Sequence, residues 1–503
     1  TDNYLSQLKK IIKEEGRPQF DNIASYELIL WHVNVDISAI NAINDMLSDE
    51  NKLITSTNTI GETFFNIEGR NIRVVIGIPV VEQAVAAESS KRQYSVNNYE
   101  EEQRRSVKKI RKYPSPSSFA HINYLHEYQN YEQEFLIYRP SGCICIPLML
   151  YNSAFFRFKR YFDDKDLPMD KDHYQWTINC IKTMANLYPD EKFRQREFHE
   201  RIRELFNKDV KILQLEDKTS NDGVLELYIH SINILYLLIK ITNEIGTGKC
   251  DPTIQAAAFY AKFYAQNKYE KILKGCNVPC FIIVLAGPWI CVLGAVYVEK
   301  PLIEPLTSFE PLILTNDRIH LEKIARLFMA LRLGCDNLMK YYESLSDSIL
   351  NVVDYQRFFP YIRTANNVGD FVYKEKLFND PHKLLWKAET KRGQTIIVKF
   401  SHKYNAYAHE VCHEIGKAPE LFFVSNMDNG FCMIIMGYIE GQKLRDCDDL
   451  SFSEYKKIIN DIEIAISHLH SKNIVFADLR DSNILVIKDD KIYHGMLIDF
   501  DWA

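Results

Sequence analysis

Apolar and polar positions alternate most regularly in the C-terminal part of the chain. Three short runs of strand composition precede one helical segment, two further strand-like runs and one long amphipathic helix. In order, these predicted elements cover residues 371–378, 384–390, 394–400, 405–416, 420–426, 431–441 and 451–473. The pattern predicts a small sheet interrupted by one helix, within a C-terminal domain spanning residues 365–503.

The middle of the chain, residues 119–350, mixes helical and strand periodicity. Helical spacing covers 170–189, 251–273 and 318–345, and consecutive strands are predicted within 223–248. The run 278–298 carries no charge and is long enough to cross a membrane. Pro279 and the Gly-Pro turn at 287–288 divide this run, so we predict two buried strands and no membrane span. A mixed α/β middle domain is expected.

The first 80 residues predict a small α+β unit. A helical pattern covers 1–18, and strand-like runs follow at 26–36 and 71–80. Residues 81–118 then change in composition, because acidic residues are followed by a basic run at 104–112 and a Pro/Ser stretch. We predict a linker here. Its basic run is either a nuclear-import or nucleic-acid-contacting arm or the solvated end of a helix.

Net charge limits the partners of the whole chain. The 503 residues carry a formal charge of -6 with a pI near 6.2, so the chain has no bulk affinity for nucleic acid. Any basic contact surface must be local. The overall fold class predicted is α+β with several domains.

The sequence ADLRDSN near the C-terminus carries the candidate chemistry. Phosphate transfer from ATP needs a carboxylate beside the acceptor hydroxyl, ligands for magnesium and a lysine for the phosphates. The spacing matches the kinase pattern D-L-x-x-x-N, which assigns Asp478 as the catalytic carboxylate and Asn483 as a metal ligand. Arg480 adds a catalytic cation between them.

The other parts of such a site lie before and after this sequence. TIIVKF resembles the V-A-I-K strand of kinases and makes Lys399 the ATP-binding lysine. Glu410 in the following helix is its predicted partner, with Glu414 as the second choice. MLIDFDW places Asp499 after a strand, where the metal-binding Asp of D-F-G lies in kinases. These residues imply ATP and Mg²⁺ as cofactors.

The pattern departs from kinases at several positions. No G-x-G-x-x-G precedes Lys399, and the corresponding turn is 379–383. Phe476 and Ala477 replace the His and Arg of H-R-D, and Asp501 replaces the Gly of D-F-G. Turn chemistry alone explains any single one of the polar residues. Their order along the chain favours a protein-kinase-like domain, whose C-lobe we expect to be incomplete because the later helices do not follow.

Two segments at opposite ends of the chain resemble the crinkler effectors, which are host-directed proteins of microbes that colonise eukaryotes. DLRDSNIL and LIDFDWA resemble their C-terminal kinase-like domain, and YNAYAHEVCHEIGKAPELFFV resembles its helix-and-strand segment. LSQLKKIIKEEGRPQFDNIASYELILWHVNVD resembles the crinkler header, a ubiquitin-like translocation domain, with residues 30–33 near its Leu/Trp motif. NIRVVIGIP resembles the last strand of that header.

This resemblance implies an arrangement and a destination. Residues 1–80 would be a header without its opening hairpin, and the chain is expected to be truncated at both ends, or else to be a degenerate effector. A chain that truly stops at residue 503 is expected to be inactive. The resemblance also implies secretion, entry into a host cell and often its nucleus. Host proteins and the host nuclear import machinery are the implied partners.

The middle domain resembles restriction-nuclease-like folds that accompany such kinases. In those folds a strand carries E-x-K, whose Glu and Lys hold a metal and activate water. Here Lys240 lacks the preceding Glu, while Asn243, Glu244 and Asp251 lie nearby in the sequence. We predict a degenerate scaffold; a strand-to-helix turn with capped ends is the alternative.

Three functions remain open from the sequence. The first is an effector kinase that transfers phosphate from Mg-ATP to Ser or Thr of a host protein. The second is a pseudokinase or binding module that acts on a host partner without catalysis. The third is a nucleic-acid-acting effector that works through the middle domain.

Overall fold

The computed structural model describes the chain as two compact units, Thr1–Arg92 and Gln93–Ala503. The residues it describes are 29–36, 71–77, 96–129, 133–140, 143, 145–229, 231–345, 353–378, 380, 382–427, 430–447, 449–489 and 492–503. In the first unit, strands β1 (Ile29–Asp36) and β2 (Asn71–Gly77) pair antiparallel. Both strands were predicted; the helix predicted at 1–18 lies outside the described residues.

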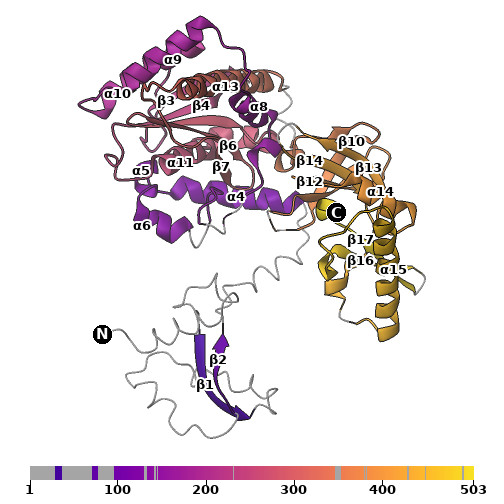
Figure 1. Ribbon diagram of the computed structural model, residues 1–503. Coiled ribbons are helices and arrows are strands. Elements are labelled where there is room, and N and C mark those ends of the chain that lie inside the picture. The colour runs from indigo at the N-terminus through magenta and orange to yellow at the C-terminus, as the bar shows by residue number, and fades with distance from the viewer. Residues whose placement is uncertain are drawn as a thin grey trace. The chain divides into compact units, whose positions relative to one another are not determined.

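A mixed sheet forms the centre of the middle domain (Figure 1). Its strands are β3 (Gly223–Ile229), β4 (Ile232–Thr242), β5 (Cys280–Ala286), β6 (Trp289–Tyr297) and β7 (Pro301–Pro305), in that spatial order, with β8 (Glu310–Pro311) against β6. Only β4 and β5 pair in parallel, because helix α11 (Pro252–Ala265) connects them. The predicted division of the apolar run into two strands is confirmed by the antiparallel β5–β6 pair.

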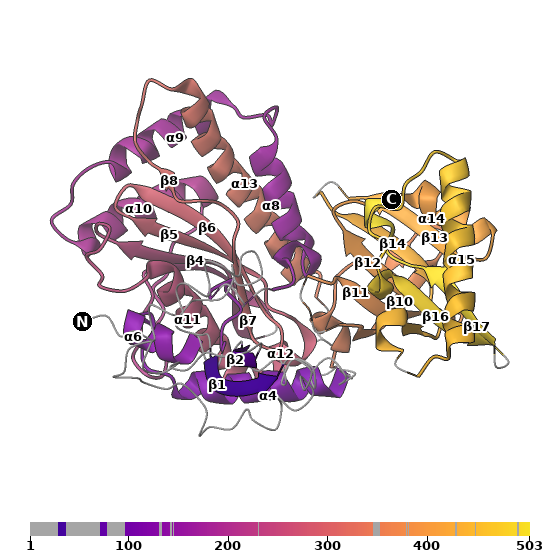
Figure 2. The same ribbon diagram turned by 60° about the horizontal axis from the view of Figure 1, so that its bottom comes forward.

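Helices cover both faces of this sheet (Figures 1 and 2). The helices are α8 (Ser153–Asp163), α9 (Lys171–Met184), α10 (Glu191–Phe206) and α13 (Arg318–Glu343) on one face, and α11 and α4 (Val96–Lys112) on the other. The predicted helices at 170–189 and 318–345 are confirmed. The helix predicted at 251–273 begins as α11 with Asp251 as its N-cap but ends at Ala265, and a separate helix, α12 (Glu270–Gly275), follows after a 3-10 turn. No helix among the described residues is long and apolar enough to cross a membrane.

The segment predicted to be a linker contains two packed helices instead, α4 and α5 (Pro116–Phe119). On α4, Gln103, Ser106 and Ile110 are buried against the sheet, and the Gln103 amide donates to the carbonyl oxygen of Val298 at 2.8 Å. Most of the charged residues face solvent, whereas Glu100 is partly buried and pairs with Arg357 at 3.3 Å. The linker prediction failed because only three positions of this helix are buried, and the many charged residues between them mask their helical spacing in the sequence.

A second sheet opens the C-terminal part of the chain. Its strands are β9 (Thr364–Ala365), β10 (Gly369–Lys376), β11 (Leu385–Thr390), β12 (Thr395–Ser401), β13 (Leu421–Asn426) and β14 (Cys432–Gly437). All pairs are antiparallel, in the order β13-β14-β12-β11-β10-β9. Helix α14 (Ala406–Glu414) connects β12 to β13. The strand and helix order predicted from the sequence is confirmed.

A three-stranded sheet and one long helix complete the chain. Strands β15 (Gln442–Lys443), β16 (Ile484–Asp489) and β17 (Ile492–Leu497) pair antiparallel, and α15 (Phe452–Ser471) packs on β17. Ser451 and Glu454 form a capping box that fixes the start of α15. At Gly495 an added Cβ would lie 2.9 Å from the carbonyl oxygen of Ile458, so the strand approaches the helix backbone closely.

One apolar core runs from the middle domain into the β9–β14 sheet. The 3-10 helix η9 (Tyr355–Phe358) lies between them. Its Gln356 side chain exchanges two hydrogen bonds of 2.9 Å with the backbone of Tyr373 on β10, and Phe359 stacks on the Tyr373 ring at 5.7 Å. These contacts fix the second sheet to the middle domain.

Candidate active site

Lys399 lies on β12, between β11 and β14 in the sheet, and its side chain is buried. Its ammonium group donates to the carboxylates of Asp499 and Asp501, the latter at 2.5 Å. The Ser401 hydroxyl donates to the second oxygen of Asp501 at 2.7 Å. We call these four residues the Lys399 cluster. Strand alternation explains it, because positions two apart on β12 face the same side.

The two carboxylates of this cluster differ in their pKa. Burial favours the neutral form of Asp499, but attraction and hydrogen bonding by Lys399 outweigh it and hold the pKa of Asp499 below its usual value. Burial raises the pKa of Asp501, and repulsion by Asp499 adds to that rise against the attraction of Lys399. Asp499 is therefore the carboxylate that is held ionised and available to a metal ion.

The backbone around Asp499 is held in an uncommon conformation. Asp499 has φ +73°, in the left-handed region, two residues after β17 ends. The backbone N–H of Asn405 donates to the Phe500 carbonyl at 3.0 Å, and that of Ala477 donates to the Trp502 carbonyl at 2.8 Å. Bonds from two separate segments thus fix the turn that carries Asp499 and Asp501.

Asp478, Arg480 and Asn483 form a second group, which we call the Asp478 cluster. The Asn483 amide donates to the Asp478 carboxylate at 2.8 Å and to its carbonyl at 3.0 Å. Arg480 forms an ion pair with the same carboxylate at 2.9 Å. The Ile498 N–H donates to the Asn483 carbonyl at 3.0 Å, which ties this loop to the turn carrying Asp499.

The two clusters are electrostatic neighbours, because Arg480 contributes to lowering the pKa of Asp499. Five of the six predicted site residues are therefore brought together, and these are Lys399, Asp478, Arg480, Asn483 and Asp499.

Glu410 does not join them, and its predicted ion pair with Lys399 is absent from the described residues. Glu410 and the second choice Glu414 are exposed on α14, whereas His409 is fully buried on its inner face. The His409 ring stacks on Phe500 with centroids 4.7 Å apart. The prediction failed because the packing of α14 on Phe500, which the sequence pattern does not show, decides which helix face points inward. Lys399 takes its partners from the Asp499 turn instead.

Asp501 is the site residue that the sequence analysis missed. In the sequence, Asp501 stands out only as a departure from D-F-G at the position of the glycine. A carboxylate in place of a glycine next to a metal-binding Asp was the available signal.

An apolar cluster lies on the same strands as Lys399. Ile397, two residues before Lys399, packs with buried Ile434 and Met436, and Leu377 and Leu385 lie against them. A flat apolar group such as a purine base suits such surroundings, because small-molecule sites combine apolar walls with a few polar groups.

Magnesium with a phosphate ligand fits the donor set. Mg²⁺ in such sites is held by one or two protein oxygen ligands together with substrate phosphates, rather than by a full protein cage. Asp499 and Asn483 supply such oxygens. No group of three His, Cys, Asp or Glu suited to a metal is found in the described parts of the chain.

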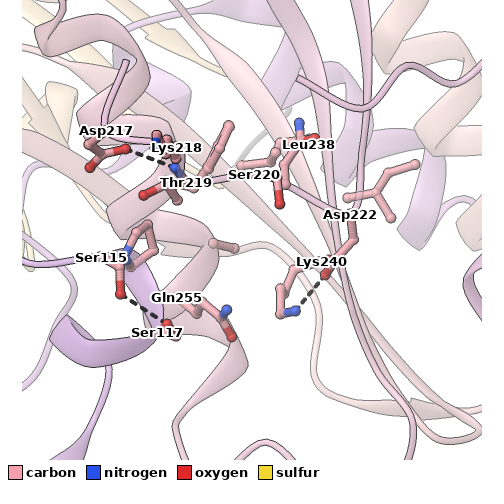
Figure 3. Close-up of a pocket in the computed structure, with 15 residues that line it drawn as sticks. Ser115, Ser117, Asp217, Lys218, Thr219, Ser220, Asp222, Leu238, Lys240 and Gln255 are labelled. Atoms are coloured by element: carbon pink, nitrogen blue, oxygen red, sulfur yellow. Dashed lines mark hydrogen bonds and ion pairs between the residues drawn. The ribbon is translucent and has the colours of Figure 1, made fainter. Parts of the chain in front are cut away.

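The middle domain contains a separate polar cavity of about 300 Å³ between β4, α11 and the loop at 217–222 (Figure 3). Figure 3 shows the Lys240 amine donating to the Asp222 carboxylate, which also accepts the Ile241 N–H at 2.8 Å. Glu191 lies 3.8 Å from the same amine. The sequence analysis missed Asp222 and Glu191, since only tertiary structure brings them to Lys240.

The residues predicted to lie near Lys240 have other partners. Glu244 forms an ion pair with buried Arg194 at 2.7 Å, and Arg194 also donates to Asn243 at 3.4 Å. Asp251 caps α11 and pairs with Arg139 at 3.1 Å. These three residues serve the turn and the helix start in this structure.

Comparison with known proteins bears on the C-terminal part alone. Residues 391–503 match the sequence model of the protein kinase domain. A probable serine/threonine-protein kinase of Dictyostelium discoideum is 38% identical over 81 residues, 15% of this chain and 15% of the relative. Serine/threonine-protein kinase D of Synechocystis sp. is 25% identical over 113 residues, 22% of each chain. The chain spans less than a quarter of either relative.

A solved structure of the Cydia pomonella granulovirus kinase PK-1 is 22% identical and aligns with 26% of this chain and 51% of that one. Its TM-score is 0.23, too low to bear on the fold. The sequence comparisons and the two clusters together support a protein-kinase-like domain at the C-terminal end of a mixed α/β chain.

Proposed function

We propose that this chain binds Mg-ATP and transfers its γ-phosphate to a Ser or Thr hydroxyl of a protein. The observation that carries the proposal is the convergence of Lys399, Asp499, Asp478 and Asn483 from three separate segments. Phosphoryl transfer depends on positioning and charge stabilisation, and these residues supply both.

Each residue has a role in this proposal. Asp478 accepts the proton of the attacking hydroxyl. The oxygen of that hydroxyl bonds to the γ-phosphorus as the bond between the γ-phosphate and ADP breaks. Lys399 holds the phosphates, and Arg480 adds positive charge where the leaving phosphate gains negative charge. Asn483 and Asp499 would hold Mg²⁺, which would neutralise negative charge on the phosphates.

A change of partners at Lys399 follows from this assignment. Two carboxylates now hold its ammonium group. If Asp499 bound a metal ion, Lys399 would keep only Asp501 as a partner and could donate to a phosphate. Asp501 thus holds the lysine in place between reaction cycles.

Radiolabelled phosphate transfer to a mixture of Ser/Thr peptides tests the proposal. We expect Asp478→Asn to abolish transfer and the matched variant Asp481→Asn, an exposed carboxylate three residues away, to retain it. Full transfer by Asp478→Asn would remove Asp478 from the reaction.

We also propose, from the resemblance at both ends of the chain, that it acts as a crinkler-type effector secreted into a host cell and its nucleus. The exposed basic face of α4, which includes Lys108 and Lys112, supports the import role. A tagged chain expressed in a host cell is expected to accumulate in the nucleus. Lys108→Gln with Lys112→Gln should prevent this, and unchanged nuclear signal would contradict the import role.

A pseudokinase that binds a host partner is the second candidate. Two observations favour it: Phe476 and Ala477 replace the His and Arg of H-R-D, and two carboxylates bind the ammonium group of Lys399. It predicts host effects that survive Asp478→Asn and Asp499→Asn. The third candidate, action on nucleic acid, would use the cavity beside Lys240, and loss of metal-dependent DNA cleavage in Asp222→Asn is its test.

A further inference from the structure

Two lysines from different sheets meet on one aromatic ring. Lys383 lies in the turn between β10 and β11, and Lys443 ends β15. Their Nζ atoms lie 5.1 and 4.1 Å from the centroid of the Phe378 ring. Both ammonium groups lie over the same ring, and Lys383 lowers the pKa of Lys443, so the two positive charges repel each other.

Lys383 lies close to the Lys399 cluster. It precedes Leu385 by two residues, and Leu385 is the cross-strand partner of Lys399 on β12. The backbone N–H of Leu377 donates to the Leu385 carbonyl at 3.0 Å, which closes the hairpin next to this pair. Lys383 thus lies near the end of the sheet that carries Lys399.

Lys443 lies close to the Asp478 cluster. It pairs with Leu485 on β16, two residues after Asn483. Burial lowers the pKa of Lys443 and Lys383 lowers it further, whereas attraction by Asp446 and, less strongly, by Asp499 opposes both. Lys443 is therefore within electrostatic reach of the proposed metal ligand.

Neither lysine has a carboxylate ion-pair partner among the described residues, whereas Lys399 has two. The turn sequence NDPHK contains no glycine, and its proline has no backbone N–H to donate. It has fewer backbone N–H donors to offer phosphates than a glycine-rich turn of the same length. What the turn offers is the compact charge of Lys383.

We propose that Lys383 and Lys443 together bind the phosphate chain of the nucleotide, in place of a glycine-rich turn. This inference rests on the proposed function, since it names further positioning residues of the same site. A polyphosphate between the two lysines relieves their repulsion and joins the β9–β14 sheet to the β15–β17 sheet. The recognised chemistry is a polyphosphate, carried by ATP or free.

Calorimetric titration of the full chain tests the inference with Mg-ATP, adenosine and inorganic tripolyphosphate. The variants are Lys383→Ala and Lys443→Ala. The control is Lys374→Ala on β10, which removes an equal charge from an exposed lysine paired with Glu389 at 3.0 Å. We expect each site variant to weaken Mg-ATP and tripolyphosphate binding about tenfold. Adenosine affinity and the control should match the wild type.

Three results would overturn the inference in distinguishable ways. Wild-type Mg-ATP affinity in both site variants removes the lysine pair and leaves the proposed function intact. An equal loss for adenosine and Mg-ATP shows that the lysines only support the fold of the sheet. A wild-type chain that binds neither Mg-ATP nor tripolyphosphate refutes the proposed function together with the lysine pair.

Discussion

The buried imidazole of His409 makes the stability of the chain depend on pH. The ring is fully buried on α14; one nitrogen lies 2.8 Å from the Pro419 carbonyl and the other 2.6 Å from the Tyr404 hydroxyl. A carbonyl only accepts, so Nε2–H donates to Pro419 and Nδ1 accepts from Tyr404. Burial lowers the pKa of His409 from 6.5 to about 4, against the effect of the Pro419 bond.

The sign and size of the effect follow from this lowered pKa. In the unfolded chain the imidazole protonates near pH 6.5, whereas in the folded chain it stays neutral until about pH 4. Stability from this group is therefore complete above pH 6.5 and is lost as the pH falls towards 4. Between pH 7.5 and pH 5 the loss from His409 alone is about 2 kcal/mol.

Urea unfolding of the full chain at pH 7.5 and pH 5 measures this loss. His409→Gln cannot protonate, so its decrease in unfolding free energy should be smaller than that of the wild type by about 2 kcal/mol. His470→Gln, which removes an exposed imidazole at the end of α15, should behave as the wild type. An identical pH dependence in wild type and His409→Gln would refute the burial argument.

Three further changes have defined outcomes. Lys399→Met leaves Asp499 and Asp501 without their cation and should cost about 3 kcal/mol in urea unfolding at pH 7.5. Because the pKa of Asp501 is raised, this cost should fall as the pH is lowered and the carboxylate protonates; a cost that does not depend on pH would contradict the pairing. Trp386→Ala removes a fully buried indole and should cost about 3–5 kcal/mol by the same measurement, whereas a cost below about 1 kcal/mol would place the ring at the surface. Arg357→Ala breaks the buried ion pair between Arg357, which lies in η9, and Glu100 on α4, and it should speed proteolytic cleavage near η9. An unchanged cleavage rate would show that this ion pair does not hold η9 to α4.

The sequence predicted those site residues whose positions depend on local structure. Lys399 was predicted because a β-branched run identifies its strand, and Asp499 because it lies two residues after another strand. Asp478 and Asn483 were found because their spacing lies within one loop. In each case the residue type and the neighbouring element are a few positions apart, so no knowledge of packing is needed.

Prediction from the sequence failed where tertiary packing decides which face of a helix is buried or which distant residues meet. His409 and Glu410 are adjacent on α14, and only the position of Phe500 determines that the histidine points inward. The pairing of Lys240 with Asp222 likewise joins residues of separate segments through the fold. The buried face of α4 is a third case, because its polar Gln103 and Ser106 are buried by hydrogen bonds rather than by apolar character.

The most direct test of the central claim is the magnesium dependence of ATP binding. Affinity for ATP is measured by calorimetry on the full chain with and without Mg²⁺, for the wild type, Asp499→Asn and the matched exposed variant Asp489→Asn. The account predicts that Mg²⁺ strengthens binding to the wild type and to Asp489→Asn but not to Asp499→Asn. Equal strengthening by Mg²⁺ in Asp499→Asn would contradict the assignment of Asp499 as the residue that brings the metal, and with it the nucleotide, to Lys399.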